Sequence, residues 1–569
     1  MNQHAILHIP DSRYCFASGE KELVLRLRMA REDEEAEVSL IHACKYDFAI
    51  KRRQEKMNIC YSDRLYHYYE IKLQLEDVRL AYIFQIEEKG NIYYYSEDGI
   101  TKTYNFEEGF YNFFQMPYIN TNDIMEVVEW MRSAVFYQIF VDRFYQGDCE
   151  KDTKYITMQW GDIPTPKSFA GGDIKGIIKK LDYIKDLGVN AIYLTPIFES
   201  VSNHKYDISD YKKVDSQFGT MEDAKELVAK AHEKGIRIIF DAVFNHCSMK
   251  MTEFQDVLSN GKKSAYYNWF LIDGEYPDPE KMNYECFATC NYMPKLNTAD
   301  QGVQDFLIEI ALYWIRETDI DGWRLDVSDE VSHEFWRRFR REVKAEKKDC
   351  VIIGENWHDA YPYLMGDQYD SIMNYSFTKA CLDYFARETF SAKEMAEKLS
   401  GNLMRNTEQV NFMMLNLIDS HDTHRFFTEV SKDKDKLLCA LALEIIVPGA
   451  PCIYYGTEIC MEGGYDPDSR RCFNWKQENW DREVMRTIKE LTALRADSVL
   501  QYGKVNLREE DEMLCVERIW EERKIVLYIN LSKREKQVSL SEDQKVMSSH
   551  RYDRELENNG FLVVMGQEI

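Results

Sequence analysis

The sequence predicts a multidomain protein in which a central (β/α)8 TIM barrel is flanked by N-terminal and C-terminal β-sandwich domains. Three observations predict this fold class. The length of 569 residues exceeds what one compact domain usually holds. The middle of the chain alternates continuous apolar segments with amphipathic helical segments, a pattern typical of parallel sheets. Both ends carry short alternating runs bounded by turn residues, which favour antiparallel sheets.

The N-terminal part, residues 1–122, is rich in tyrosine and short alternating runs such as KELVLRLRM and HYYEIKLQL. It lacks any long helical pattern, so we predict a β-sandwich there. At the other end, residues 487–569 return to short strands such as RKIVLYINLS and GFLVVMGQ, which predict a C-terminal β-domain.

Eight apolar segments between the two ends are predicted as the barrel strands. They are residues 134–144, 190–197, 237–246, 321–327, 350–357, 370–377, 410–422 and 449–456. Segments with helical spacing, at 171–189, 220–236, 300–320 and 329–346, alternate with them. Eight strands fit a barrel better than an open sheet. We assign the barrel to residues 123–246 and 300–486, with the irregular stretch 247–299 as a domain inserted after the third strand.

Charge and composition exclude several partners. With 98 acidic and 72 basic residues the net charge is −26, and no basic block interrupts it, so we expect neither nucleic acid nor an anionic membrane as a partner. The first residues show no basic leader with an apolar run, and Glu444, Pro448 and Pro451 interrupt the best membrane candidate, 437–456. Fourteen scattered cysteines then favour reduced thiols in a cytoplasm.

Polar and charged residues gather where the predicted strands end. In a barrel of this type the active site lies at the carboxyl ends of the strands. Arg324 and Asp326 lie two residues apart on one strand and therefore share a face, where the guanidinium can help keep the carboxylate ionised. Each residue alone has an ordinary structural explanation, but their convergence favours a site. The candidates are Asp241, Asn245, His246, Arg324, Asp326, Glu355, His421 and Asp422.

Three carboxylates with different neighbours suit retaining glycoside hydrolysis, which needs one ionised nucleophile and one proton-bearing acid. Asp326, beside Arg324, suits the nucleophile. Glu355 has no cation near it in the sequence and suits the acid that later acts as a base. Asp422 is then free to bind sugar hydroxyls.

The sequence resembles the α-amylase family of glycoside hydrolases. The segments DAVFNH, GWRLDVSDE, GENW and IDSHD stand in the order of its four signature regions, and MPKLN and GAPCIYYGTE resemble two auxiliary regions. The segments PTPKSFAGGDIKGI and SNHKYDISDY, together with the extra N-terminal β-domain, are similar to the neopullulanase, cyclomaltodextrinase and maltogenic amylase group, whose N-terminal domain is starch-binding-like.

Carried over by residue, the resemblance implies a nucleophile at Asp326, an acid/base at Glu355 and a transition-state stabiliser at Asp422. It also implies that Tyr206 stacks on the sugar and that Trp357 lies at the +1/+2 subsites, where the leaving part of the substrate binds. Asp466 and Arg470 would close the −2 side, two sugar units in the opposite direction. The substrate-binding set as a whole is His204, Tyr206, Asp241, His246, Arg324, Trp357, His421, Asp466 and Arg470.

The resemblance further implies cleavage of α-1,4-glucosidic bonds in cyclodextrins, pullulan or short maltooligosaccharides, and a homodimer formed through the N-terminal domain. No cofactor is required. The group often binds calcium after the first barrel strand, where Asp148 and Asp152 are the candidate ligands, although Gln146 and Lys151 are unusual in such a loop.

Three alternatives remain. The same barrel supports α-1,6-glucosidase or glucanotransferase activity, because either water or a sugar hydroxyl can take the covalent intermediate. A non-catalytic sugar-binding protein is disfavoured because all three carboxylates are present. An unrelated metal-dependent barrel enzyme is disfavoured because no strand carries HxH ligand spacing.

Overall fold

Eight parallel strands form the central sheet in a computed structural model that describes residues 1–540, 544–550 and 552–567. A parallel bridge between Met373 and Leu415 joins the two edge strands and closes the barrel, which confirms the predicted fold class. In spatial order the strands are β18 (Ser371–Ile372), β17 (Val351–Gly354), β16 (Gly322–Leu325), β15 (Arg237–Ala242), β12 (Ala191–Leu194), β11 (Phe136–Ile139), β20 (Ala450–Tyr454) and β19 (Leu415–Asn416).

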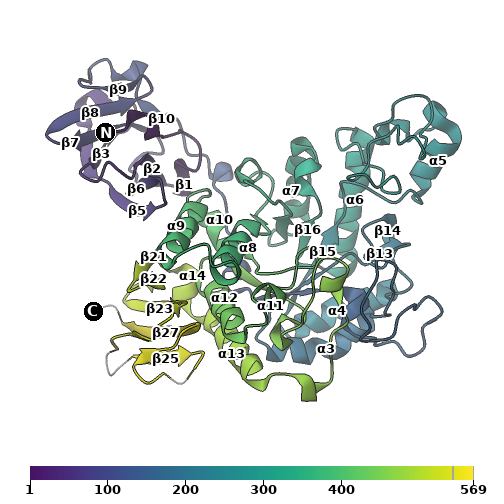
Figure 1. Cartoon of the computed structure of the whole chain (residues 1–569). Coiled ribbons are helices and arrows are strands. Elements are labelled where there is room, and N and C mark those ends of the chain that lie inside the picture. Colours follow the sequence, from purple (N-terminus) through teal and green to yellow (C-terminus); the bar gives the residue numbers. More distant parts are fainter. Residues whose placement is uncertain (541–543, 551, 568–569) are drawn as a thin grey trace. The chain divides into compact units, whose positions relative to one another are not determined.

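Amphipathic helices cover the barrel, and their first residues explain where they begin. Figure 1 shows α3, α4, α6 and α7 around β15 and β16. Thr220 and Asp223 form a reciprocal capping box at the start of α4, and the Asp173 side chain accepts the Gly176 N–H at the start of α3. The main helices of the barrel region are α3 (Ile174–Asp186), α4 (Met221–Glu233), α6 (Gln301–Thr318), α7 (His333–Glu346), α8 (Tyr375–Cys381), α12 (Lys434–Ile446) and α13 (Arg482–Ala493).

Three predicted strands were too long. Residues 410–422 begin within the helix α10 (Glu408–Met413) and then contain the two-residue strand β19, and residues 370–377 contain β18 followed by α8. Residues 134–144 contain β11 followed by the short helix α2 (Val141–Phe144). The Asn374 side chain accepts the Phe377 N–H and so starts α8 inside the apolar run. Short apolar runs do not distinguish a buried strand from a buried helix, which explains these errors.

Two excursions carry residues to the barrel rim. The hairpin β13 (Phe198–Ser200) and β14 (Ile208–Val214) follows β12, and its turn contains His204 and Tyr206. The inserted stretch 247–299 holds α5 (Thr252–Asn260), and an antiparallel bridge between His246 and Lys295 ties its end to the end of β15.

The N-terminal region folds into two antiparallel sheets, as predicted. One sheet has the order β1-β2-β6-β5, and the other β4-β3-β7-β8-β9, with β10 paired to β7. Inward side chains including Leu25, Leu27, Leu40 and Phe84 form a common core. The strands are β1 (Cys15–Gly19), β2 (Glu22–Ala30), β3 (Glu37–Ala43), β4 (Arg53–Lys56), β5 (Asn58–Ser62), β6 (Tyr66–Gln74), β7 (Leu80–Glu88), β8 (Asn91–Ser96), β9 (Gly99–Thr101) and β10 (Phe114–Met116), and the short helix α1 (Phe48–Lys51) lies between β3 and β4.

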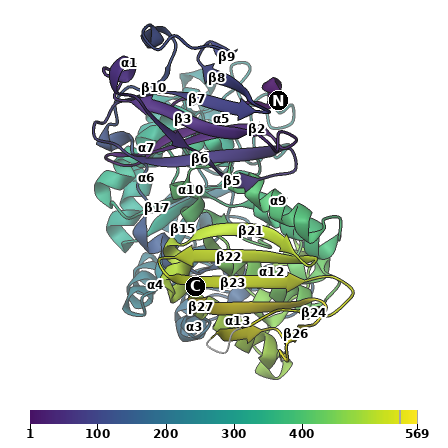
Figure 2. The same ribbon diagram turned by 90° about the vertical axis from the view of Figure 1, so that its left-hand side faces the viewer.

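The C-terminal part is also a β-domain. Figure 2 shows its antiparallel sheet face-on, in the order β21-β22-β23-β27-β25, and β24 pairs separately with β26. The strands are β21 (Lys504–Glu510), β22 (Met513–Trp520), β23 (Arg523–Asn530), β24 (Lys536–Gln537), β25 (Lys545–Ser548), β26 (Glu555–Leu556) and β27 (Gly560–Gln567). Residues 541–543, 551 and 568–569 of the predicted domain lie outside the described residues.

By internal packing the chain divides into two compact units. One comprises Met1–Val127, Phe390–Asn411 and Asn506–Cys515, and the other comprises Val128–Thr389, Phe412–Val505 and Val516–Ile569. The domain boundaries given above therefore stay predictions. Among the described residues, none of the helices combines the length and the apolar character needed to cross a bilayer.

Candidate active site

The predicted catalytic residues meet at the carboxyl ends of three adjacent strands. Asp241 lies in β15 opposite Arg324 in β16, and Asp326 and Glu355 directly follow β16 and β17. All four side chains are buried. Because parallel strands point the same way, residues far apart in the chain are brought to one rim.

The guanidinium of Arg324 contacts the carboxylates of Asp241, Asp326 and Glu355. Arg324 Nη1 donates to Asp241 Oδ2 at 2.9 Å and to Asp326 Oδ1 at 2.8 Å. Arg324 Nη2 lies 2.7 Å from Glu355 Oε2, an ion pair without the alignment of a hydrogen bond. The expectation that Glu355 has no nearby cation is therefore wrong. Asp326 and Glu355 lie within the span of a single guanidinium.

Carboxylates outnumber cations in this cluster, which changes their protonation. Burial raises the pKa of Asp326 well above its usual range, and the neighbouring carboxyls add to this while Arg324 opposes it. Burial likewise raises the pKa of Asp241 to about 6, against the effects of Arg324 and Tyr193. The sequence predicted that Arg324 keeps Asp326 ionised. In the structure the cost of burial outweighs that effect.

Two N–H groups fix the orientation of Glu355. The Val327 backbone N–H donates to Oε2 at 3.0 Å, and Trp357 Nε1 donates to Oε1 at 3.1 Å. Val327 has φ of 44°, an uncommon value for a β-branched residue, and such strain is typical of functional sites. The Trp357 ring lies flat on Tyr375 with 3.6 Å between the ring centroids, and 46% of Trp357 is exposed, so this ring can serve as an aromatic platform beside Glu355.

Neutral rings form the adjoining wall. Tyr206 OH lies 2.6 Å from His421 Nε2 and donates to Asp241 Oδ2 at 3.0 Å, and the Tyr206 and His421 rings are nearly parallel. Burial lowers the pKa of His421 well below its usual range and that of His246 to about 3, so both rings are neutral at pH 7. His246 Nε2 is buried without a hydrogen-bond partner among the described residues and lies 4.0 Å from Asp326 Oδ2.

Asp422, the third predicted catalytic carboxylate, lies outside the Arg324 cluster. It contacts Arg470, in a group of side chains that is more exposed than that cluster. Its Oδ1 accepts from Arg470 Nη2 at 3.3 Å, and Arg470 Nη1 lies 3.0 Å from Asp466 Oδ1, so these three predicted residues are in contact. His204 sits nearby under Tyr206, where its Nδ1 lies 3.1 Å from the Tyr206 N–H. Burial lowers the pKa of His204 to about 4.

Sequence reasoning missed three residues of this site. Tyr193 in β12 donates to Asp241 Oδ2 at 2.6 Å, and Gln138 in β11 lies 2.6 Å from His421 Nδ1. Phe287, in the inserted stretch, stacks on His246 at 4.8 Å. A glutamine inside the apolar run FYQIF was a usable signal for Gln138, but nothing in the local pattern marked Phe287.

The predicted calcium ligands do not form a metal site. Asp148 Oδ2 pairs with Lys175 at 2.9 Å, and Asp152 Oδ1 accepts the Lys154 backbone N–H. Within the described residues, no group of three or more His, Cys, Asp or Glu side chains is arranged to hold a metal ion.

An ammonium group sits in this loop instead. Lys151 Nζ lies 2.8 Å from Asp173 Oδ2 and donates to the carbonyl oxygens of Gly171 at 2.6 Å and Gln217 at 3.2 Å. A carboxylate with two carbonyls is a donor set suited to a hard cation, and here it surrounds a lysine. The residues present therefore do not fit calcium.

Comparison with known families assigns most of the chain. Residues 138–493 match the family described as "Alpha amylase, catalytic domain", and residues 1–120 match "Alpha amylase, N-terminal ig-like domain".

Individual relatives are similar over nearly the full length. A cyclomaltodextrinase of Thermoanaerobacter pseudethanolicus is 42% identical over 547 residues, covering 95% of each chain. An intracellular maltogenic amylase of Bacillus subtilis is 38% identical over 553 residues, covering 95% of this chain and 93% of the other. Among solved structures, a cyclomaltodextrinase superimposes with a TM-score of 0.91 at 34% identity, covering 100% and 98% of the two chains.

Proposed function

Since the chain belongs to the α-amylase family of glycoside hydrolases, we propose that it cleaves α-1,4-glucosidic bonds in cyclodextrins, pullulan or short maltooligosaccharides with retention of configuration. The observation that carries this proposal is the Arg324 guanidinium, which contacts both Asp326 and Glu355 and so holds the two carboxyls together. Retaining enzymes need that proximity because one carboxyl must attack the carbon whose bond the other helps to break.

The two carboxyls take separate steps. Asp326 attacks the anomeric carbon through Oδ2, the oxygen that Arg324 does not hold. Glu355 donates its proton to the departing glycosidic oxygen, and the glycosyl group is left as an ester on Asp326. Glu355 then removes a proton from water, the resulting hydroxide attacks the same carbon, and the ester bond to Asp326 breaks.

The remaining residues bind the sugar. His246 Nε2, which has no hydrogen-bond partner among the described residues, faces the position of a hydroxyl next to Asp326. Tyr206 supplies a ring for the apolar face of the sugar, and Asp422 accepts from hydroxyls whose hydrogen bonds strengthen as the ring flattens toward an oxocarbenium ion. Arg470 holds Asp422 in place through the contact between its Nη2 and Asp422 Oδ1.

We further infer that the ammonium of Lys151 replaces a structural calcium ion in the loop between β11 and α3. It supplies one positive charge to Asp173 and two donors to carbonyl oxygens. No calcium is then needed for this loop to fold.

A homodimer formed through the N-terminal domain is part of the proposal. Four apolar side chains of that domain are strongly exposed, with Tyr46 at 76%, Ile50 at 82%, Phe110 at 64% and Tyr111 at 76%. Ile50 lies in α1 and Tyr46 just before it, while Phe110 and Tyr111 belong to the turn 109–111, and these two segments lie against each other through Phe48 and Gly109. An apolar patch of this kind is typical of an interaction surface. If Phe110→Ser with Tyr111→Ser leaves the mass in solution unchanged at that of a dimer, this surface is not the interface.

We place the protein in the cytoplasm. The support is that all 14 cysteines are free, as expected for a reducing compartment, and that one relative carries the word intracellular in its name. Fractionation of the native host tests the assignment.

The decisive experiment compares β-cyclodextrin, pullulan and soluble starch as substrates. We expect faster cleavage of cyclodextrin than of starch, and a product whose first-formed anomer is α. Glu355→Gln should lose activity on natural glucans but retain most of it on a glucosyl fluoride, whose leaving group needs no proton. A first-formed β anomer, or full activity of Glu355→Gln on cyclodextrin, would refute the mechanism. Panose from pullulan, or transfer products, would instead specify the α-1,6 or glucanotransferase alternatives.

A further inference from the structure

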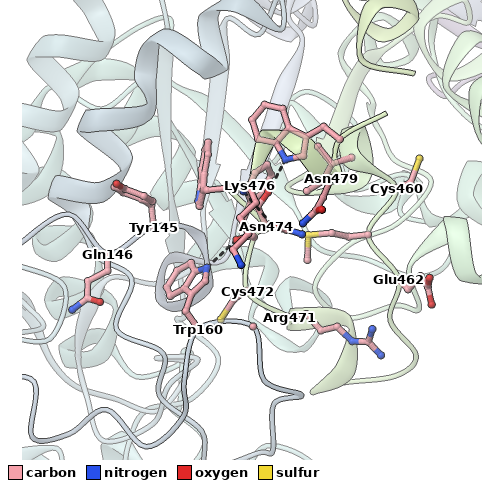
Figure 3. Close-up of a pocket in the computed structure, with 16 residues that line it drawn as sticks. Tyr145, Gln146, Trp160, Cys460, Glu462, Arg471, Cys472, Asn474, Lys476 and Asn479 are labelled. Carbon is pink, nitrogen blue, oxygen red and sulfur yellow. Dashed lines mark hydrogen bonds between the residues drawn. The ribbon is translucent and has the colours of Figure 1, made fainter. Parts of the chain in front are cut away.

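A second pocket, walled by aromatic rings, lies outside the catalytic cluster. Its volume is about 710 Å³, within the range of roughly 300–1,000 Å³ that small-molecule sites occupy. In Figure 3, Tyr145, Gln146 and Trp160 line one side and Cys460 and Glu462 line the other. Phe473, Trp475 and Trp480 complete the aromatic wall.

Trp160 is the exposed ring of this pocket. Its indole is 36% exposed, and Nε1 donates to the Phe473 carbonyl at 2.9 Å, which fixes the ring in place. Trp475, by contrast, packs against several other rings, including Phe473 at 4.2 Å, and lies under the Lys180 ammonium. Among the described residues no other aromatic ring packs against Trp160. No aromatic ring therefore covers the exposed part of Trp160, which lines the pocket.

The wall behind Trp160 is rigid before any ligand binds. Arg143 Nη1 donates to the Arg470 carbonyl at 2.8 Å, and the Phe473 N–H donates to the Arg143 carbonyl at 2.8 Å. Tyr455 OH donates to the Arg471 carbonyl at 2.6 Å. A site that is already ordered loses little entropy on binding. The same segment begins at Arg470, which touches Asp422, so the pocket and the catalytic cleft share one stretch of chain.

Polar groups at the rim suit a neutral, hydroxyl-rich ligand. Gln146, Lys476 and Asn479 are exposed, and none of their side chains is hydrogen-bonded to another described residue. The other charged rim residues are already compensated, since Arg471 pairs with Asp468 at 2.7 Å and Glu462 with Lys432 at 2.8 Å. Lys476 is then the one charged residue of the lining without an ion-pair partner among the described residues, so the rim offers a single ammonium beside the two neutral amides.

We propose that this pocket is a second α-glucan-binding site, in which the apolar face of a glucose unit stacks on Trp160 while Gln146, Lys476 and Asn479 bind its hydroxyls. An aromatic plane with amide and ammonium groups beside it is the combination that holds a sugar ring. The choice of α-glucan as the ligand class rests on the function proposed above. The site lets the enzyme retain a long glucan whose other end lies in the cleft.

The test is calorimetric titration of maltotriose into the full-length Asp326→Asn variant, which should not consume the ligand. We expect two ligands per chain. Adding Trp160→Ala should weaken one of them about tenfold or more, equivalent to about 1.4 kcal/mol or more, and leave the other unchanged. Trp520→Ala is the matched control, because Trp520 is 37% exposed against 36% for Trp160 but lies in the C-terminal sheet. One ligand per chain, or two that ignore Trp160→Ala, would overturn the proposal.

A second pair of measurements guards against misfolding and separates this inference from the proposed function. If Trp160→Ala lowers the melting temperature, the exposed pair Gln146→Ala with Asn479→Ala should still weaken the same ligand several-fold, and no weakening by that pair would overturn the proposal. In the active enzyme, Trp160→Ala should reduce kcat/KM on soluble starch several-fold and leave it unchanged on maltotriose. Normal hydrolysis with no Trp160-dependent ligand would refute only this inference. Trp160-dependent binding without hydrolysis would refute only the proposed function.

Discussion

Arg324 and Lys151 are two buried cations at the same end of the barrel, and they differ in charge balance. Arg324 contacts three carboxylates, those of Asp241, Asp326 and Glu355. Lys151 contacts one carboxylate, that of Asp173, and two backbone carbonyls. In the first cluster, burial and the neighbouring carboxyls raise the pKa of Asp326 well above its usual range, although Arg324 opposes this. In the second cluster one cation faces one carboxylate, so the two charges balance.

The largest expected effect is the loss of activity when the carboxylate of Asp326 is removed from the cluster around Arg324. Asp326→Asn should lower kcat by at least about 10⁴-fold, because it removes the atom that forms the glycosyl ester. The melting temperature should stay the same or rise, because the cost of burying this carboxyl disappears. Activity assays with thermal unfolding check both. The control is Asp329→Asn, an exposed carboxyl three residues further on, for which a change below tenfold is expected.

Removing the charge of Lys151 should have the opposite effect to Asp326→Asn, because stability should fall while activity is kept. Lys151→Met leaves Asp173 buried without its cation, which should lower the free energy of unfolding by about 3–5 kcal/mol. The kcat of the folded enzyme should change little, because Lys151 contacts none of the catalytic residues. Denaturant titration and kinetics below the transition measure the two quantities.

The matched control for Lys151 is Lys154→Met, an exposed lysine of the same loop, which should cost less than about 0.5 kcal/mol. If Lys151→Met costs no more than this control, the ammonium does not replace a structural cation.

The buried carboxyls of Asp241 and Asp326 should also determine how stability depends on pH. A carboxyl whose pKa is higher in the folded state than in the unfolded state stabilises fully below the unfolded value and loses that contribution as pH rises through the folded value. For Asp241 this window runs from about 4 to about 6. The pKa of Asp326 is also raised in the folded state. The free energy of unfolding should therefore fall more for the wild type than for Asp326→Asn as pH rises from about 4.

In activity, the acidic limb of kcat/KM should have an apparent pKa above about 4, the usual value for aspartate, because Asp326 must lose its proton to attack. A pH–rate profile from pH 3 to 8 measures it. An acidic limb at or below the ordinary aspartate value would show that burial and the neighbouring carboxyls do not raise the pKa of Asp326 in the free enzyme.

The smallest expected effect concerns metal removal. Dialysis against EDTA should shift the melting temperature by less than about 1 °C, and added calcium should not raise it, because a ligand stabilises only a state that it binds. A fall of several degrees that calcium reverses would show that a metal, rather than Lys151, holds the fold together.

Sequence reasoning located the carboxyl-end rim of the barrel because the order of the strands and the spacing of the motifs can be read from the sequence. It placed Asp326 and Glu355 at strand ends, where the structure has them, but it also placed Asp422 at a strand end, whereas β19 already ends at Asn416. It did not foresee that Arg324 reaches Glu355. That contact depends on register, since Arg324 is paired with Ile353 on the next strand and Glu355 lies two residues further on, on the same face.

Other parts of the site depend on tertiary packing that no local pattern carries. Phe287 reaches His246 only because the inserted stretch folds back and its end pairs with His246 through Lys295. The protonation of Asp326 likewise follows from how deeply the rim is buried, which sequence spacing does not give. The helix α10 was misread as a strand because burial hides the periodicity that would distinguish them.

The barrel is closed where its strands are shortest. β18 and β19 have two residues each, and across this join Asn374 supplies a backbone N–H to Leu415 at 2.8 Å and a side-chain amide to Asn416 at 2.8 Å. Because few hydrogen bonds join β18 to β19, we expect these two strands to separate before any other pair in the barrel. Amide protons of β18 and β19 should then exchange with deuterium sooner than those of β15 and β16. Asp422 follows β19 after a few residues, so we expect local opening at this join to displace Asp422 more than Asp326 or Glu355.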